Sequence, residues 1–282
     1  MTADVENSKP AISPKLAFFT AVQFLTRMPV PGAMSGTIEN YRAALQASVV
    51  YFPLVGVLIG VFTTVTFCVA NCFWSPWVAA ILAIAAEALL TGAFHEDALA
   101  DATDALGGGW TREQVLEILK DSRHGTYGVL ALVVGVSLRI ALLSNLSWSM
   151  AWLAIPFSAG IGRWSILIFM HRLEPIQDRQ TMARDVGSKT SGSTILWGAT
   201  SPILAFGIAL AWLCSVDSDV STTAILIKAS VGFVLALVFS LLMTWYYEGL
   251  VRRRVGGATG DFLGANCYLV QLTTLLSMQA GM

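Results

Sequence analysis

Charged residues are scarce in this sequence. Of its 282 residues, 17 are Lys or Arg and 18 are Asp or Glu, a charged share of 12%, against about 25% in soluble domains. Hydrophobic residues reach 55% and the mean hydropathy is +0.67. These values exclude a water-soluble globule, a disordered chain and a fibre. Because the net charge is only −1, nothing global attracts nucleic acid, and we expect an integral protein of the lipid bilayer.

Cysteine is also rare. The four residues Cys68, Cys72, Cys214 and Cys267 form no CxxC pair, so we expect inert buried thiols rather than a disulfide framework or a metal site. The sequence contains no tandem repeat, no low-complexity segment and no long linker. It therefore predicts a single integral membrane domain over residues 1–282.

Long uncharged runs define the fold class. Because a helix rises 1.5 Å per residue, roughly 20 apolar residues span the hydrocarbon core. Closed β-barrels alternate apolar and polar residues, whereas these runs are continuous, so we expect an all-α polytopic membrane helix bundle. About seven transmembrane helices are predicted, near residues 47–70, 76–94, 128–146, 150–170, 194–215, 225–246 and 262–280. The last segment is also compatible with a re-entrant or interfacial helix.

The basic residues predict the orientation of these helices. Fourteen of the 17 Lys and Arg lie in four segments, residues 1–46, 95–127, 171–193 and 247–261. The alternate connections carry none. The positive-inside rule therefore places the N-terminus and all four segments in the cytoplasm. Residues 1–46 are predicted to form an N-terminal cytoplasmic or interfacial segment, and they do not resemble a cleaved signal peptide.

The segment 95–127 begins with clustered acidic residues. On a helix, Asp97, Asp101 and Asp104 fall within about 60° of one another, so three carboxylates share one face. Like charges arranged in this way repel, and a cation between them would remove the repulsion. Carboxylate oxygens without thiolates favour Mg²⁺ or Mn²⁺ over zinc. The alternative is a solvated acidic helix end, and the neighbouring His95 is either a general base or an ordinary interfacial histidine.

The same segment then offers phosphate-binding side chains. The spacing Thr111 to Gln114 is typical of a capping box and predicts a short surface helix. The residues Lys120 to Gly128 combine cationic donors, the carboxylate of Asp121 and glycines, a mixture that fits phosphate recognition. The alternative interpretation is a basic anchor next to the membrane.

Two further cytoplasmic segments carry basic residues. The segment 171–193 is polar and mildly basic, which suits either a cover for a large anionic substrate or a solvated connection. Three consecutive arginines, Arg252 to Arg254, precede a glycine-rich stretch that ends at Asp261. Arginines here are the expected inside anchor. The glycines and Asp261 add either an anion-binding nest or a further metal ligand.

Several of these motifs together resemble one family, the cobalamin synthases, or adenosylcobinamide-GDP ribazoletransferases. The motifs occur in order as Phe24–Pro31, Tyr51–Gly56, Gly92–Asp101, Lys120–Arg123, Gly125–Gly128 and Gly257–Asp261. The resemblance extends from about residue 24 to about residue 270. Four positions depart from the family pattern, namely Ala98 and Ala105 in place of glycine, Leu119 in place of methionine and His124 in place of an aliphatic residue.

The resemblance implies a Mg²⁺-dependent transferase of the prokaryotic cytoplasmic membrane, with its active site facing the cytoplasm. Members join adenosylcobinamide-GDP to α-ribazole or α-ribazole 5′-phosphate in the last steps of vitamin B12 assembly, and release GMP. The resemblance leaves open whether the enzyme forms a homo-oligomer or associates with other enzymes of cobalamin assembly.

The reaction assigns a hypothetical role to each motif residue. Asp97, Asp101 and Asp104 are expected to bind Mg²⁺, with Glu96 or Asp261 completing the shell. Substrate binding is assigned to Arg27, Lys120, Ser122, Arg123 and Thr259. His95 or Asp121 is expected to accept the proton of the ribazole hydroxyl, and Asp97 and Asp101 are counted among the catalytic residues.

Two other functions are alternatives to this one. A CDP-alcohol phosphotransferase performs similar chemistry, but its characteristic aspartate pattern is absent from the sequence. An ion-coupled transporter is expected to carry ionisable groups near the midplane, and only Glu87 and Arg139 lie deep in predicted spans. At comparable depth, these two residues are expected to form a structural ion pair.

Overall fold

The computed structural model describes residues 12–30, 38–176, 190–216 and 222–281. Most of the predicted segment 171–193, and the first eleven residues of the predicted N-terminal segment, lie outside these ranges. Within them the chain is helical, and its only β-type pairing is an isolated bridge between Pro175 and Ala258. The predicted all-α class is confirmed.

Every predicted span corresponds to a helix. The first part of the chain forms α1 (Pro14–Leu25), α2 (Ile38–Ser48), the 3₁₀ turn η1 (Val49–Tyr51), α3 (Phe52–Asn71), α4 (Pro76–Thr91), α5 (Phe94–Gly108) and α6 (Arg112–Ile118). The remainder forms α7 (Thr126–Ser144), α8 (Trp148–Arg172), α10 (Gly192–Val216), α11 (Thr222–Arg254) and α12 (Gly260–Gly281). The capping box at Thr111 and Gln114 is confirmed at the start of α6.

In the described residues, five helical segments are long and apolar enough to cross a membrane. A sixth span results if α4 and α5, which are bent by 88° relative to each other, count as one. The helix α12 is not among these spans, although it packs in the middle of the bundle against α5, α8 and α11. The predicted number of seven spans therefore stays a prediction.

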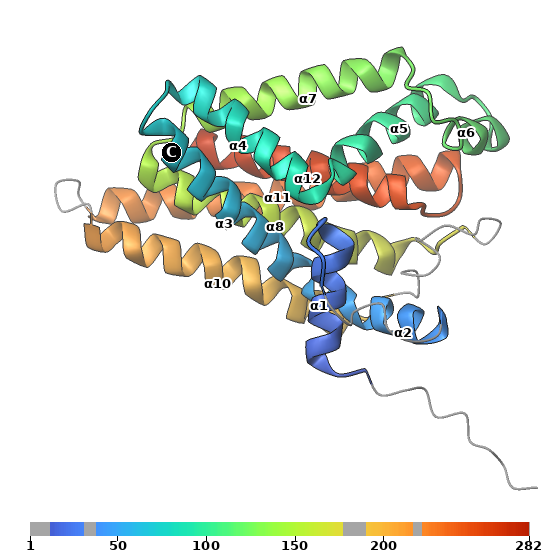
Figure 1. Ribbon diagram of the computed structural model, residues 1–282, viewed down its shortest axis with the longest axis horizontal. Coiled ribbons are helices and arrows are strands. Elements are labelled where there is room, and N and C mark those ends of the chain that lie inside the picture. The colour runs from blue at the N-terminus through green and yellow to red at the C-terminus, as the bar shows by residue number, and fades with distance from the viewer. Residues whose placement is uncertain (1–11, 31–37, 177–189, 217–221, 282) are drawn as a thin grey trace, which may run out of the picture.

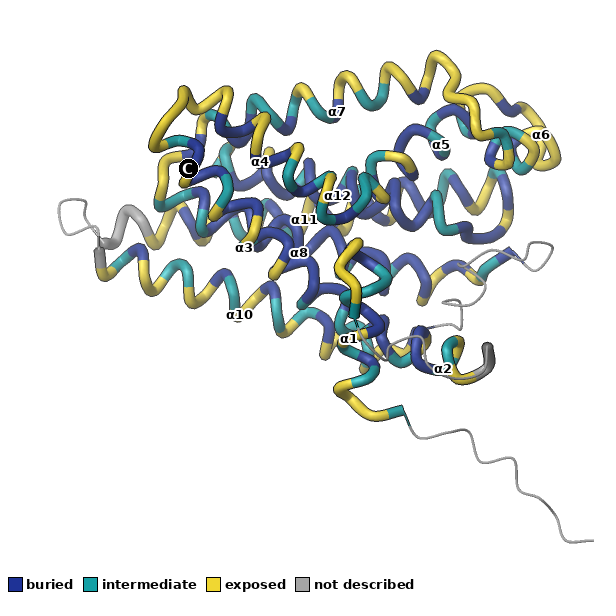
Figure 2. Tube along the Cα trace, viewed as in Figure 1, coloured by how far each residue is buried: buried dark blue, intermediate teal, exposed yellow. Residues whose placement is uncertain are grey.

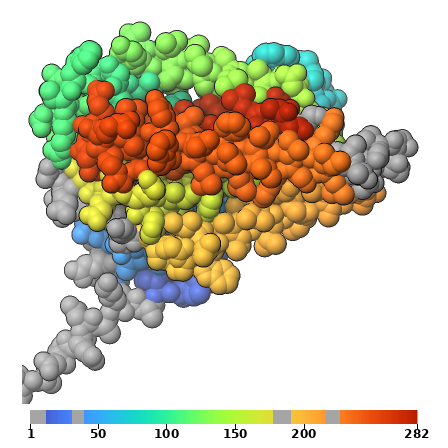
Figure 3. All heavy atoms as spheres, turned by 180° about the vertical axis from the view of Figure 1, so that it is seen from behind, coloured from blue at the N-terminus to red at the C-terminus, as the bar shows by residue number. Residues whose placement is uncertain are grey.

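Small residues let the central helices approach closely. A Cβ atom on Gly56 would lie 2.6 Å from the carbonyl oxygen of Ala159, and one on Gly60 would lie 2.5 Å from the Cα of Pro156. These contacts join α3 to α8 along a GxxxG spacing, which is typical of membrane helix pairs. The helices α7, α10 and α11 instead expose large apolar side chains along their outer faces, as lipid contact requires (Figure 2). The view from behind shows α11 between α10 and α12 (Figure 3).

The long connections gather at one end of the bundle. Figure 1 shows α6, the loop from α11 to α12 and the end of α8 together at that end, away from the short connections α3–α4 and α7–α8. This grouping agrees with the predicted pattern of basic segments. The four cysteines are free thiols; Cys68 and Cys267 are buried, but Cys72 is exposed in the α3–α4 connection. The expectation that all four are buried is therefore wrong for Cys72, because α3 ends one residue before it.

Candidate functional site

A sharp bend between α4 and α5 sets the direction of α5, the helix that carries Asp97, Asp101 and Asp104. The helix α4 ends at Thr91, and the next two residues, Gly92 (φ 72°) and Ala93 (φ 55°), adopt left-handed conformations. Glycine commonly ends a helix in this way, whereas a non-glycine residue there costs roughly 1–2 kcal/mol. The bend directs α5 away from α4, so that α5 packs against α7 and α12. The sequence-based expectation that the span continues to residue 94 misses this bend.

Arg27 lies against the bend. Its backbone N–H donates to the carbonyl of Leu90 at 2.7 Å, and a Cβ on Gly92 would lie 2.1 Å from its Nε. The cationic side chain therefore lies at the C-terminal end of α4, where the helix dipole favours positive charge. Its predicted role in substrate binding stays a prediction.

Two helices contribute to one acidic face, which we define as Asp97 and Asp101 of α5 and Asp261 of α12. The side chain of Asp97 is 65% exposed and that of Asp101 is 25% exposed. Asp101 experiences repulsion from Asp97, Asp261 and Asp104. The structure thus brings together three predicted metal ligands that are separated by up to 164 positions in the sequence.

His124 borders the acidic face. Its Nδ1 lies 3.5 Å from Oδ1 of Asp101, and its Nε2 lies 4.0 Å from Oδ1 of Asp97. In the sequence, His124 stands out only as a departure from the family pattern. No sequence signal identifies its approach to the acidic face, because that approach depends on the packing of the start of α7 against α5.

Asp104 points to the start of α7 instead of the open face. Its carboxylate accepts from the backbone N–H of Gly125 at 2.6 Å and of Gly128 at 2.8 Å. A Cβ on either glycine would lie within 2.5 Å of the carboxylate oxygens, so both positions require glycine in this arrangement. Asp104 therefore fixes α7 against α5, and metal binding by Asp104 stays a prediction.

Glu96 and His95 face the interior of the bundle. Oε1 of Glu96 lies 3.5 Å from Nη1 of Arg139. His95 is only 3% exposed; its Nδ1 lies 3.5 Å from Nη2 of Arg163, and its Nε2 has no hydrogen-bond partner among the described residues. The structure does not bring these two side chains to the acidic face. Their predicted roles as metal ligand and proton acceptor are not supported by this placement.

The predicted phosphate-binding residues lie in the connection that ends at His124. Lys120, Ser122 and Arg123 are exposed there. Arg123 donates from Nη2 to Oδ2 of Asp121 at 2.6 Å. These hydrogen bonds lower the pKa of Asp121 to about 2. Such a carboxylate is a weak proton acceptor while the pair persists.

The hydroxyl group of Thr259 forms its hydrogen bonds with groups of the protein itself. It is buried at the start of α12, where its Oγ1 accepts from the N–H of Phe262 at 3.4 Å and donates to Oδ2 of Asp261 at 3.4 Å. It therefore holds Asp261 and the first turn of α12 in place. A direct contact between Thr259 and substrate stays a prediction.

The connection between α11 and α12, just before Asp261, is fixed to α5 and α6. Arg254 donates to the carbonyls of Leu106 and Gly109 at the end of α5, where a cation also offsets the helix dipole. Arg112 donates from Nε to the carbonyl of Val255 at 3.0 Å. These contacts set the position of α12 relative to the acidic helix.

The acidic face suits a hard divalent cation. In the described ranges, no three His, Cys, Asp or Glu side chains are close enough to hold a metal ion by themselves. Mg²⁺ usually takes only one or two carboxylates, and completes its shell with water and substrate phosphate oxygens. The oxygen-only donor set and the mutual repulsion of its carboxylates fit that mode of binding.

Comparison with known proteins identifies the family. A family model described as Cobalamin-5-phosphate synthase matches residues 17–279. The chain is 35% identical over 268 residues to the adenosylcobinamide-GDP ribazoletransferase of Shewanella pealeana, covering 90% of this chain and 94% of that protein. It is also 35% identical over 266 residues to the enzyme of the same name from Rhizobium etli, covering 92% and 94%. No solved structure matches the chain. The chain therefore belongs to the cobalamin-5-phosphate synthase family, whose members include the adenosylcobinamide-GDP ribazoletransferases.

Proposed function

We propose that this enzyme transfers the adenosylcobinamide phosphate group of adenosylcobinamide-GDP to α-ribazole or to α-ribazole 5′-phosphate on a Mg²⁺-binding acidic face. The acceptor is a ribose hydroxyl that is free in both molecules, so a 5′-phosphate, where present, is left unchanged. An oxygen of the acceptor bonds to the cobinamide-linked phosphorus, the bond from that phosphorus to the bridging oxygen breaks, and GMP leaves with that oxygen. The single observation that supports this site is the convergence of Asp97, Asp101 and Asp261 from two helices.

The acidic face and the residues beside it would have separate roles in the reaction. Bound Mg²⁺ would offset the negative charge of the diphosphate and of the leaving GMP. Two carboxylates of the acidic face would hold it, those of Asp97 and Asp101 on α5 or one of them together with Asp261 on α12, while Thr259 positions Asp261. Lys120, Ser122 and Arg123 would donate to phosphate oxygens from the connection that ends beside the acidic face.

The proton of the ribazole hydroxyl needs an acceptor. His95 and Asp121 are the candidates from the sequence, but each is engaged by an arginine, Arg163 and Arg123 respectively. Asp121 would have to leave Arg123 to reach the acceptor oxygen. His95 could accept the proton at Nε2 while Nδ1 stays beside Arg163, but its side chain would have to turn from the interior of the bundle toward the acidic face.

The test is GMP release by the detergent-purified protein, given adenosylcobinamide-GDP and α-ribazole with Mg²⁺ or with EDTA. We expect metal-dependent GMP formation matched by new cobalamin. Asp97→Asn and Asp101→Asn should each lower turnover by at least a hundredfold. The control is Glu117→Gln, which removes an exposed carboxylate of α6. Turnover in EDTA equal to that in Mg²⁺, or near-normal turnover of either aspartate variant, would refute the metal assignment.

The acidic face is proposed to open to the cytoplasm of a prokaryotic cell from its inner membrane. The supporting observation is that the basic connections share one end of the bundle (Figure 1), which the positive-inside rule assigns to the cytoplasm. Cys72 lies in a connection at the opposite end. A membrane-impermeant maleimide should therefore label Cys72 in intact spheroplasts, with Cys72→Ser as the control. Labelling of Cys72 only after lysis would mean that Cys72 faces the cytoplasm and that the proposed orientation is wrong.

Membrane residence is proposed to serve association with other enzymes of cobalamin assembly, because the substrates themselves are soluble. Gentle solubilisation followed by affinity purification should recover such enzymes with this protein. The same preparation, weighed by light scattering, reports whether the protein is a homo-oligomer. Purification of this chain alone from gently solubilised membranes would count against the association.

A further inference from the structure

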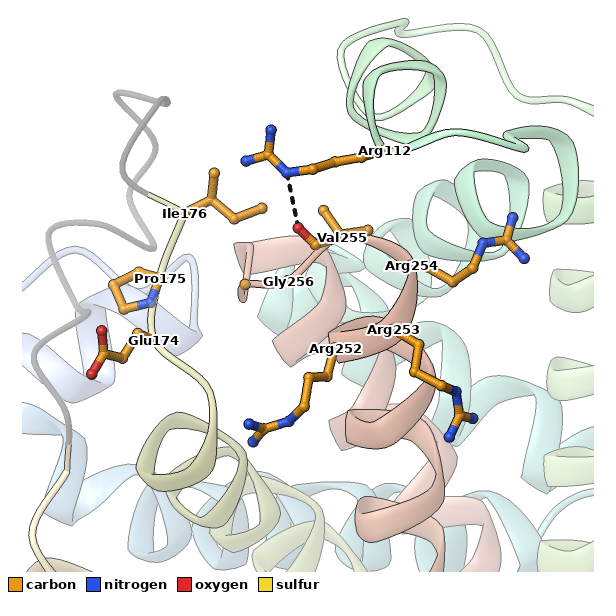
Figure 4. A pocket seen from close by; sticks show the side chains of 10 residues that line it. Arg112, Glu174, Pro175, Ile176, Arg252, Arg253, Arg254, Val255 and Gly256 are labelled. Carbon is orange, nitrogen blue, oxygen red and sulfur yellow. Dashed lines mark hydrogen bonds between the residues drawn. The ribbon is translucent and has the colours of Figure 1, made fainter.

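A cavity with several arginines in its lining lies beside the connection that leads from α11 to Asp261 at the start of α12. Its volume is about 600 Å³, within the usual range for small-molecule sites. It lies between the end of α11, Arg112 of α6 and the segment 174–176 that follows α8. Figure 4 shows Arg112 and Arg252 at different edges of this space and the segment 174–176 facing them, whereas Arg253 and Arg254 point away from that segment.

The two arginines at the edges are held in place by other bonds. Arg252 donates from Nε to Oε1 of Glu248 at 2.6 Å and from Nη2 to the carbonyl of Arg172 at 2.5 Å. Arg112 is held by its bond to the carbonyl of Val255 (Figure 4). Such fixed guanidinium groups bind phosphate with a smaller loss of side-chain entropy. The cavity therefore offers preorganised cationic donors.

One lining residue, Glu174, carries a carboxylate, and its backbone carbonyl accepts from the N–H of Ala258 at 2.8 Å, which fixes the segment beside the cavity. Figure 4 shows its exposed side chain on the side of the segment away from Arg112 and Arg252, so the carboxylate has to rotate toward the cavity to contact a ligand. A carboxylate would weaken a site meant for phosphate alone. Guanine, however, presents an N1–H and an exocyclic amino group as adjacent donors, and a carboxylate can accept from both. The mixed charge of the cavity thus matches a guanine nucleotide better than inorganic phosphate.

The cavity lies within reach of the acidic face. Gly257 lines the cavity, and Asp261 follows four residues later, so their Cα atoms are at most about 14 Å apart. Arg254, the last residue of α11, donates to the end of α5. One extended nucleotide could therefore place its base in the cavity and its diphosphate beside Asp261.

We propose that this cavity binds the guanosine phosphate end of the substrate, with Arg112 and Arg252 on phosphate oxygens and Glu174 on the guanine ring. This inference rests on the proposed function, and it assigns the part of the nucleotide that leaves as GMP. Arginines at a membrane surface also bind phosphate groups of anionic lipids. The nucleotide and the lipid would both bind through phosphate oxygens. Only the nucleotide carries a base, so a preference for one base distinguishes the two ligands.

The experiment measures equilibrium binding of GMP to the detergent-purified full-length protein, with AMP and inorganic phosphate as competitors. We expect GMP to bind at least tenfold more tightly than AMP. Arg112→Gln and Arg252→Gln should each weaken GMP binding about tenfold or more, as for the loss of a charge-assisted hydrogen bond. Glu174→Gln should reduce the preference for GMP over AMP without changing competition by inorganic phosphate.

The matched control is Arg253→Gln, which removes the same charge from the neighbouring residue of the same helix but from a side chain that points away from segment 174–176. It should leave GMP binding within twofold of wild type. Thermal unfolding of every variant identifies those that fold, and the use of two arginines from different elements guards against one that does not. Wild-type GMP binding by folded Arg112→Gln and Arg252→Gln would overturn the proposal.

A second experiment tests whether anionic lipid occupies the cavity. The same binding measured in nanodiscs with and without phosphatidylglycerol should give the same GMP affinity. Displacement of GMP by that lipid, together with equal binding of AMP, would mean a lipid headgroup site and would overturn the proposal. Because no corrinoid is present, GMP binding without turnover would count against the proposed function alone. Turnover with an unchanged KM for adenosylcobinamide-GDP in folded Arg252→Gln would count against the cavity alone.

Discussion

Arg139 of α7 forms a hydrogen-bonded ion pair with Glu87 of α4 in the interior of the bundle, and both side chains are at most 3% exposed. Arg139 also lies 3.5 Å from Glu96 of α5, and Glu87 accepts from Oγ1 of Thr63 at 2.6 Å. One guanidinium therefore serves two carboxylates from the two helices that meet at the bend. The structural pair predicted from the sequence is confirmed, and it has a third member that links it to the acidic helix.

Arg139→Gln should destabilise the protein more than Glu87→Gln does. Loss of Arg139 leaves the buried carboxylate of Glu87 and the partly buried carboxylate of Glu96 without this cation, and breaking a buried pair typically costs about 3–5 kcal/mol. Loss of the charge of Glu87 leaves Arg139 beside Glu96, so its cost should be smaller. Thermal unfolding in detergent measures both, with Glu117→Gln as the exposed control. Equal losses in the two variants would contradict the shared role of Arg139.

Asp104→Asn should behave as a stability variant, in contrast to Asp97→Asn. An amide has a single accepting oxygen, so it would leave the N–H of Gly125 or Gly128 facing an NH₂ group. The expected cost is about 1–3 kcal/mol, whereas the exposed Asp97 should tolerate Asn within about 0.5 kcal/mol. Unfolding midpoints and GMP release are measured on both variants. An Asp104→Asn protein that is as stable as wild type but inactive would show that Asp104 binds metal or substrate.

The sequence predicts the features of this site that depend on local spacing. The positions of Asp97 and Asp101 on one face follow from helical periodicity alone, and the spans follow from hydropathy. The convergence with Asp261, the approach of His124 and the capping of α7 by Asp104 depend on how distant helices pack. No single-sequence pattern encodes that packing. The bend was missed because Ala93 is a good helix former, and its left-handed conformation runs against its own preference.

Gly92→Ala should cost more stability than Gly256→Ala. Both glycines have positive φ, 72° and 79°, so each substitution carries a backbone cost of roughly 1–2 kcal/mol. Among the described residues, a new Cβ would meet a neighbour only at residue 92, where Nε of Arg27 would lie 2.1 Å away, whereas no described atom lies within 4 Å at residue 256. Unfolding midpoints of the two variants give the difference, and Arg27→Ala in the Gly92→Ala background should recover it. Equal losses at both positions would mean that Arg27 does not press on the bend.

Asp121→Asn should leave the shape of the pH–rate profile unchanged between pH 5 and 9. Arg123 lowers the pKa of Asp121 to about 2, below the ordinary value of 3.8. A depressed pKa means that the pair is fully formed above about pH 4 and is lost only as the pH falls through about 2, so Asp121 keeps its charge over the whole measured range.

The measurement is GMP release at constant ionic strength, because salt screens so exposed a pair. Wild-type protein in the same buffers is the reference. If the variant is slower but the acidic and basic limbs of its pH–rate profile stay at the same pH, Asp121 acts by positioning Arg123. An acidic limb that disappears in Asp121→Asn would show instead that Asp121 leaves Arg123 in the working enzyme and takes the proton of the ribazole hydroxyl itself.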